Sequence, residues 1–171
     1  VNLRNFSRLD AAKTSDVNLN DCVEQTLTIA NSVVKGKVSI VKQLAGGLPM
    51  FKGGPSQINQ IILNLVTNAA QAICNDSGEI VLTSWADDDA VHLSVADNGP
   101  GIEQKYLSRV FDPFFTTKAH GEGTGLGLSI SFQIAQAHGG ALSVRSEVGL
   151  GSTFTLSLPL RSAAKPVAEL A

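Results

Sequence analysis

A row of side-chain amides is the first feature of this sequence that could do chemistry. At helical spacing its six members fall on one face of a single helix: Gln57, Gln60, Asn64, Asn68, Gln71 and Asn75. No charged residue lies between the first and the last of them, whereas a solvated helix face normally carries lysine and glutamate. Amides donate and accept hydrogen bonds, and their oxygens are acceptable ligands for Mg²⁺. The row favours a polar surface facing a ligand, although amides that simply stay in water fit the same pattern.

Two glycine-containing segments could bind a nucleotide. In Asp97–Ile102 (DNGPGI), Gly99 and Gly101 permit a close approach of backbone to a flat ligand, and the carboxylate of Asp97 can accept hydrogen bonds from a purine amine. For this hexapeptide alone, an ordinary turn capped by Asp97 is the preferred interpretation.

The second segment, Gly121–Leu128 (GEGTGLGL), runs directly into a predicted helix. Its exposed N–H groups and the positive end of the helix dipole together form an anion cradle, to which Lys118 can add a positive charge. A flexible surface loop is the alternative, but it does not account for the helix that follows.

Between these segments lies Val110–Lys118 (VFDPFFTTK), which holds three of the seven phenylalanines. Exposed aromatic side chains in a loop are costly, so we expect them to anchor it as the latch of a hinged lid. A satellite hydrophobic cluster under a long loop is the alternative, and the two can coexist.

The elements that must position these residues follow from periodicity and turn signals. In the first half we expect a short strand at 17–19, a helix that Asn20 or Asp21 caps and Gly36 ends, a strand at 38–44 and a connection at 45–54. Next we expect a helix that Ser56 caps and that runs to about residue 74, followed by a hairpin of strands 79–86 and 90–96. After a long loop we expect a helix at 125–138 and strands at 141–146 and 153–158. This order predicts an α+β fold, a two-layer sandwich with helices on one face of a mixed sheet.

The bulk properties fit one domain. The 171 residues carry a net charge of −2, which disfavours nucleic acid as the main partner. No apolar run is long enough to cross a bilayer, so we expect no direct membrane contact from this piece. Two isolated cysteines, Cys22 and Cys74, suit a reducing compartment. Because the first residue is Val1, we expect a fragment of a longer protein.

Taken in order, the segments resemble the boxes of the histidine kinase catalytic domain. Asn59–Ile73 is similar to its asparagine box, Asp97–Ile102 to its first glycine box, Val110–Lys118 to its phenylalanine box and Gly121–Ile130 to its second glycine box. The resemblance covers about residues 17–160 and implies the Bergerat ATP-binding fold with a mobile ATP lid. It implies a catalytic domain at 14–161, preceded by the end of a dimerisation helix and linker at 1–13 and followed by a mobile tail at 162–171.

The resemblance also implies a role for each matching residue. Asn68 is the expected Mg²⁺ ligand, and Asn64 lies beside the ATP phosphates as a catalytic residue together with Lys118. Asp97 accepts from the adenine amino group with support from Thr153. The remaining ATP-binding residues are Gly99, Gly101 and Ile102 at the base, Thr116, Thr117 and Lys118 in the lid, and Gly123, Thr124, Gly125, Leu126, Gly127 and Leu128 at the phosphates. Gln71 and Ala72 depart from relatives that carry a basic residue and an aromatic there.

The implied reaction transfers the ATP γ-phosphoryl group to a histidine on a dimerisation domain, for relay to an aspartate of a response regulator. None of His92, His120 and His138 has the acceptor context, so the acceptor would lie elsewhere in a homodimeric, cytoplasmic or inner-membrane-anchored protein. Hydrolysing relatives carry a glutamate where this chain has Asn64, and an amide is a poor general base. The alternatives are a serine kinase of the anti-sigma-factor type and a regulatory domain that senses nucleotide without phosphoryl transfer.

Overall fold

The computed structural model describes residues 14–34, 38–73, 77–117 and 124–160. The predicted dimerisation-helix end, the predicted C-terminal tail, Lys118 and Gly123 lie outside these ranges. In chain order the elements are β1 (Ser15–Val17), α1 (Leu19–Val34), β2 (Val38–Leu44), β3 (Phe51–Gly53), α2 (Pro55–Ala72), β4 (Gly78–Ala86), β5 (Ala90–Asp97), α3 (Gln104–Leu107), α4 (Gly127–Ala137), β6 (Ala141–Glu147) and β7 (Gly151–Pro159).

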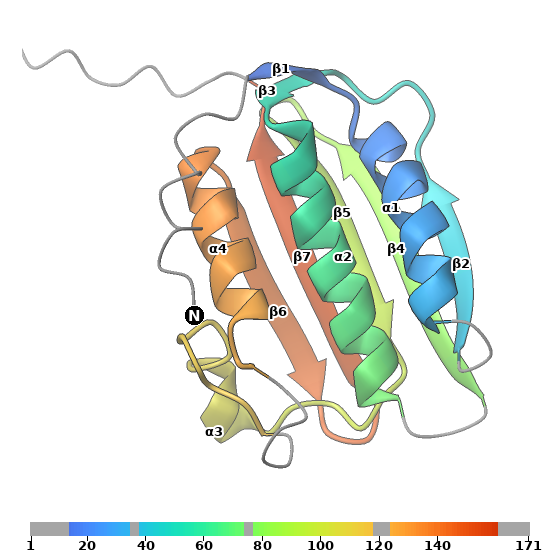
Figure 1. Cartoon of the computed structure of the whole chain (residues 1–171), viewed down its shortest axis with the longest axis vertical. Coiled ribbons are helices and arrows are strands. Elements are labelled where there is room, and N and C mark those ends of the chain that lie inside the picture. The colour runs from blue at the N-terminus through green and yellow to red at the C-terminus, as the bar shows by residue number, and fades with distance from the viewer. Residues whose placement is uncertain (1–13, 35–37, 74–76, 118–123, 161–171) are drawn as a thin grey trace, which may run out of the picture.

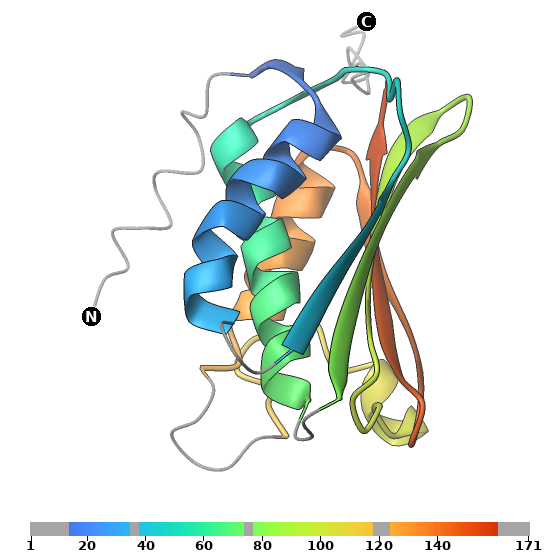
Figure 2. The ribbon, with the colours of Figure 1, turned by 90° about the vertical axis from the view of Figure 1, so that its right-hand side faces the viewer.

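A five-stranded sheet forms one layer of the fold (Figure 1). Its strand order is β2-β4-β5-β7-β6, with β2 parallel to β4 and every other pair antiparallel. Helices α1, α2 and α4 cover one face, and the opposite face carries no helix among the described elements (Figure 2). The predicted two-layer sandwich with a mixed sheet is confirmed.

The core lies between the helices and the sheet. Burial alternates along β5 and β7, as expected for strands with one covered face, so that Leu93, Leu156 and Leu158 point toward the helices. On α2 the aliphatic side chains are buried, including Ile58, Ile61 and Leu65. Burial of each such side chain contributes about 2 kcal/mol to stability.

The start of α2 differs from the prediction. The N-cap is Gly54, no side chain caps the helix, and Pro55 occupies its first turn, so Ser56 is not the cap. Proline suits this position because its fixed φ matches the helix and its missing N–H would have had no helical partner. The prediction of Ser56 as the N-cap was therefore wrong, because the helix starts at the preceding Pro55.

The start of α1 also differs. Asn18, rather than Asn20 or Asp21, is the cap, since its Oδ1 accepts the N–H groups of Asn20 (2.9 Å) and Asp21 (3.3 Å). The short strand before it is β1, which pairs antiparallel with β3 in the stretch predicted as a connection. Strands of three residues are too short to produce a periodic signal.

None of the helices in the described ranges combines the length and hydropathy needed to span a bilayer.

Candidate nucleotide site

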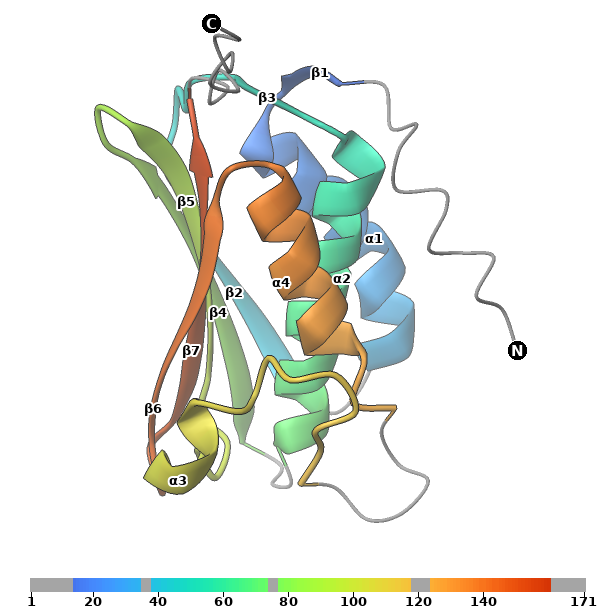
Figure 3. The same ribbon diagram turned by 90° about the vertical axis from the view of Figure 1, so that its left-hand side faces the viewer.

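The segments that carry the candidate residues meet at one end of the molecule. Strand β5 and helix α2 end there, α4 begins there, and α3 and the β6–β7 turn lie beside them (Figures 1 and 3). Asp97 is the last residue of β5 and Gly127 the first of α4. The fold therefore brings together five segments that lie far apart in the chain.

The amide side chains of the row on α2 differ in their exposure to solvent. Asn64 and Asn68 are half-buried, whereas Gln60 and Gln71 are exposed. Asn75 lies outside the described part of the chain. Gln57 is half-buried as well, so the interpretation of an amide that stays in water fits Gln60, while Asn64 and Asn68 stay candidates for contact with a ligand.

Asn64 joins α2 to the first turn of α4. Its Nδ2 donates to the carbonyl oxygen of Gly127 (3.1 Å) and to the hydroxyl of Ser131 (3.1 Å). Ser131 Oγ in turn donates to the same Gly127 oxygen (2.9 Å). Both amide hydrogens of Asn64 are thus committed, and only its Oδ1 is left to interact with a ligand.

Asn68 lies one helical turn after Asn64. Its side chain is half-buried on the same face of α2. Among these residues, no three histidine, cysteine, aspartate or glutamate side chains gather in a group that could hold a metal ion. Neutral amide oxygens on one helix face fit Mg²⁺, which keeps several waters and takes further oxygens from phosphates.

Asp97 ends β5 with its side chain turned toward the helices. Only 9% of the residue is exposed. Burial raises the pKa of the carboxyl group, while hydrogen bonds from the backbone N–H groups of Gly99 and Ser152 act in the opposite direction. The N–H of Gly99 lies 2.9 Å from Oδ1. A buried acceptor of this kind is suited to an N–H donor of a bound base.

The loop after β5 packs against the β6–β7 hairpin without room for side chains. Gly101 has φ +74°, and a Cβ there would collide with the carbonyl of Glu147. Gly151 has φ +113°, and a Cβ there would collide with the carbonyl of Asp97. Glycine is therefore required at both positions, and the hairpin forms one wall of the site.

Ser146 on β6 fixes this wall and was missed by the sequence analysis. Its Oγ accepts the N–H of Ile102 (2.8 Å), donates to the carbonyl of Gly151 (2.8 Å) and lies 3.0 Å from Oγ of Ser152. The N–H of Gly149 also donates to the carbonyl of Pro100 (2.8 Å). A single serine in a strand carries no sequence signal, so only the folded chain shows its position.

The structure does not bring Thr153 to Asp97. Asp97 pairs with Ser152 across β5 and β7, and Thr153 pairs with Ala96. Paired residues share a face of the sheet, so the side chain of Ser152 lies on the covered face with Asp97 and that of Thr153 lies on the other. The residue beside Asp97 is therefore Ser152, one position before the predicted Thr153. In a strand, a shift of one position moves the side chain to the other face of the sheet.

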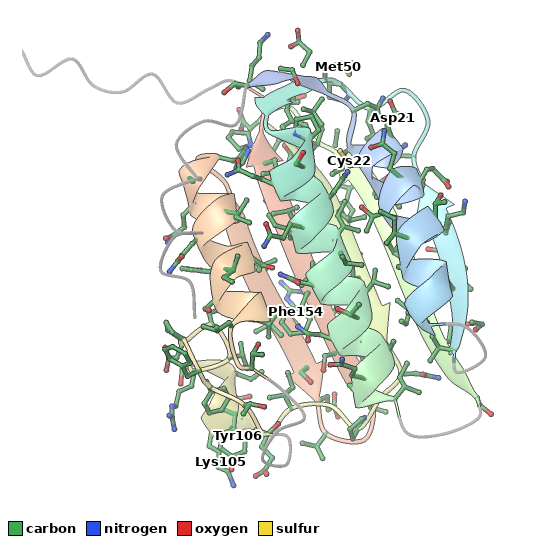
Figure 4. The ribbon with its side chains drawn as sticks, in the orientation of Figure 1. Asp21, Cys22, Met50, Lys105, Tyr106 and Phe154 are labelled. Carbon is green, nitrogen blue, oxygen red and sulfur yellow. The ribbon has the colours of Figure 1, made fainter. Side chains whose placement is uncertain are left out.

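The phenylalanine segment is anchored by two of its three rings. Phe111 stacks on Phe132 of α4 (5.1 Å between centroids) and meets the edge of Phe154 on β7 (6.4 Å), which lies between α2 and α4 in Figure 4. Phe115 packs against Tyr106 of α3 (5.7 Å). Phe114 is 74% exposed with φ +65°. The predicted hydrophobic cluster is present, while hinged movement of a lid stays a prediction.

The start of α4 is open to an anion. Its N-cap is Leu126, no side chain of the described residues caps it, and the N–H groups of the first turn can therefore bind a ligand. The preceding Gly125 has φ +64°, and its carbonyl accepts the N–H of Phe114 (2.9 Å). Thr116, Thr117 and Thr124 are exposed, and Leu128 packs partly against the core.

The described histidines lie away from this end. On the open sheet face, His92 contacts Ser157 Oγ and Asp87 Oδ2, each at 2.9 Å. His138 is the C-cap of α4, and its Nε2 accepts the N–H of Gly54 at the start of α2 (3.0 Å). His120 falls outside the described residues.

Comparison with known proteins gives the same family throughout. A family model described as histidine kinase-, DNA gyrase B-, and HSP90-like ATPase matches residues 53–162. The chain is similar to the signal transduction histidine-protein kinase AtoS of Escherichia coli (strain K12), with 39% identity over 160 residues. These residues make up 92% of this chain and 26% of AtoS, so the chain spans about a quarter of the length of that relative.

Among solved structures, the catalytic domain of histidine kinase ThkA has a TM-score of 0.76 and 29% identity, over 86% of this chain and 98% of that one. Full-length ShkA in complex with AMPPNP has a TM-score of 0.78 and 32% identity, over 95% of this chain and 35% of ShkA. ThkA has also been solved in complex with the response regulator protein TrrA. The chain therefore belongs to the family of histidine kinase-, DNA gyrase B- and HSP90-like ATPases, within which it is a catalytic domain of the sensor histidine kinase type.

Proposed function

We propose that this domain binds Mg·ATP at the end of the sheet where Asp97 lies and transfers the γ-phosphoryl group to a histidine of a dimerisation domain. The observation that carries the proposal is the meeting of three features at this end. They are the buried acceptor Asp97, the half-buried amides of α2 and the uncapped start of α4. The ShkA complex with AMPPNP supports nucleotide binding by the same architecture.

The base would bind between α2 and the β6–β7 hairpin. Asp97 would accept from the adenine amino group, with Ser152 beside it on the same face of the sheet. Gly99, Gly101 and Ile102 would let the backbone lie against the ring.

The triphosphate would bind the start of α4 and the segments around it. The first-turn N–H groups of α4, with Gly123–Leu128, would hold phosphate oxygens, and Thr116, Thr117 and Lys118 would close over them as a lid. Asn68 would hold Mg²⁺ through its amide oxygen, and the bound ion would neutralise charge on the phosphates. Because both amide hydrogens of Asn64 are committed to α4, Asn64 would act on the ligand only through Oδ1.

Transfer to an imported histidine is favoured over hydrolysis. Asn64 stands where a hydrolase needs a base, and its amide carries no proton-accepting nitrogen. The γ-phosphoryl group would pass from ATP to Nε2 of the acceptor histidine, ADP would leave, and the group would then move to an aspartate of a response regulator. The ThkA–TrrA complex supports such a partner. We further propose a cytoplasmic position and a homodimeric, membrane-anchored full-length protein, by analogy with sensor kinases.

A phosphorylation assay tests the proposal. The chain is mixed with γ-labelled ATP and a separately purified dimerisation domain of a related sensor kinase. A label on that domain that is lost in acid and kept in base marks phosphohistidine. A label stable in acid would instead identify a serine kinase, and nucleotide binding without any label would identify a sensing domain.

A further inference from the structure

The hydroxyl of Ser146 has no hydrogen-bonding capacity left over. A serine hydroxyl has one hydrogen to donate and two lone pairs to accept with. Ser146 donates its hydrogen to the carbonyl of Gly151 (2.8 Å) and accepts the N–H of Ile102 (2.8 Å). Its third contact, at 3.0 Å, is Oγ of Ser152. Because the hydrogen of Ser146 is already used, Ser152 must be the donor in this contact.

The donation by Ser152 fixes what its oxygen can offer to a ligand. Its only hydrogen points to Ser146, so its Oγ presents lone pairs alone. Ser152 is 7% exposed and shares a sheet face with its cross-strand partner Asp97, whose ionised carboxylate also only accepts. Two neighbouring acceptors match the two hydrogens of an amino group and oppose a keto oxygen.

We propose that Ser146 is a positioning residue for base selection, which holds Ser152 as an acceptor and so favours a 6-amino purine over a 6-keto purine. The inference rests on the proposed function, since it requires the base to lie against Asp97 and Ser152. Without Ser146, the hydrogen of Ser152 can turn toward a keto oxygen or toward Asp97. Either movement reduces the difference in affinity between a 6-amino purine and a 6-keto purine.

The test compares ATP with inosine triphosphate, whose base carries a keto oxygen in place of the amino group. Calorimetric titration gives the ratio of the two affinities for the wild-type chain and for Ser146→Ala. We expect this ratio to fall about tenfold in the variant, from the loss of one oriented hydrogen bond. If Ser146 had only a structural role, its replacement would weaken the binding of both nucleotides equally and leave the ratio of the affinities unchanged. Ser146→Thr, which keeps the hydroxyl, and Ser143→Ala, on the open face of β6, should keep the wild-type ratio.

A double-mutant cycle shows whether Ser146 acts through Ser152. Ser152→Ala should lower the ratio, and adding Ser146→Ala to it should lower the ratio no further. An unchanged ratio in Ser146→Ala, or a further fall in the double variant, overturns the inference. If Ser146→Ala does not fold, Ser146→Cys replaces it, because a thiol fills the space but hydrogen-bonds weakly. A wild-type chain that binds neither nucleotide contradicts the proposed function itself, which is a separate outcome.

Discussion

Nδ2 of Asn64 on α2 lies 3.1 Å from the hydroxyl of Ser131 on α4, and this contact connects the helix of the proposed metal ligand to the helix whose start is proposed to bind the phosphates. Ser131 is fully buried, so the contact forms away from water. It also fixes the orientation of the Asn64 amide, since the second hydrogen donates to Gly127. The two helices therefore present their polar groups to the site as one unit.

We predict that Ser131→Ala weakens ATP binding about fivefold and leaves adenosine binding unchanged. The substitution removes about 1 kcal/mol of hydrogen bonding that holds the start of α4 against Asn64, which affects the phosphates and not the base. Calorimetry with ATP and with adenosine measures the difference. Ser129→Ala is the matched control, because Ser129 is also buried in the first turn but donates only to Leu126 of its own helix. Equal losses in both variants would contradict the prediction.

We predict that Asn68→Ala lowers the affinity for ATP at least about tenfold in the presence of Mg²⁺ and has little effect when the metal is chelated. The amide oxygen is proposed to bind the ion rather than the nucleotide, so its contribution requires the ion. Titrations with and without Mg²⁺ separate the two states. Gln60→Ala, an exposed amide of the same row, should behave as wild type. An unchanged Mg·ATP affinity would rule out Asn68 as the ligand.

We predict that Asp97→Asn reduces the preference for ATP over GTP. The variant replaces a pure acceptor with an amide that can rotate to present N–H groups, so the site no longer opposes the keto oxygen of guanine. Competition titrations of the two nucleotides measure the preference. If the variant kept the wild-type preference for ATP over GTP, Asp97 would not contribute to recognition of the base.

The same variant should be more stable than wild type at neutral pH. Burial raises the pKa of Asp97, so in the folded chain the charged form is disfavoured relative to the unfolded chain. The folded state therefore gains stability from protonation at low pH and loses it as pH rises through the raised pKa. Asparagine has no charge to bury, so its advantage in melting temperature should be largest near pH 7 and shrink as pH falls toward 4. An advantage that did not change with pH would contradict this.

The elements that sequence predicted well have long periodic patterns or strong turn residues. Helix α2, the β4–β5 hairpin and the glycines that precede α4 are examples. What sequence could not provide is register and hydrogen-bond direction. The predicted support of Asp97 by Thr153 is not found, because a shift of one residue along a strand moves the side chain to the other face of the sheet. The commitment of Asn64 to α4 depends on contacts 63 and 67 residues away in the chain, which no local pattern records.

Our last prediction separates the anchored and exposed rings of the phenylalanine segment. Phe111→Ala should lower the free energy of unfolding by about 3 kcal/mol, because it leaves the rings of Phe132 and Phe154 without their shared partner. Phe114→Ala should change it little, since that ring is 74% exposed. Phe114→Gly should have a free energy of unfolding about 1 kcal/mol higher than that of Phe114→Ala, because the positive φ at this position disfavours any side chain. Urea unfolding of the three variants measures these differences. Equal stability of Phe111→Ala and wild type would show that the segment is not anchored through this ring.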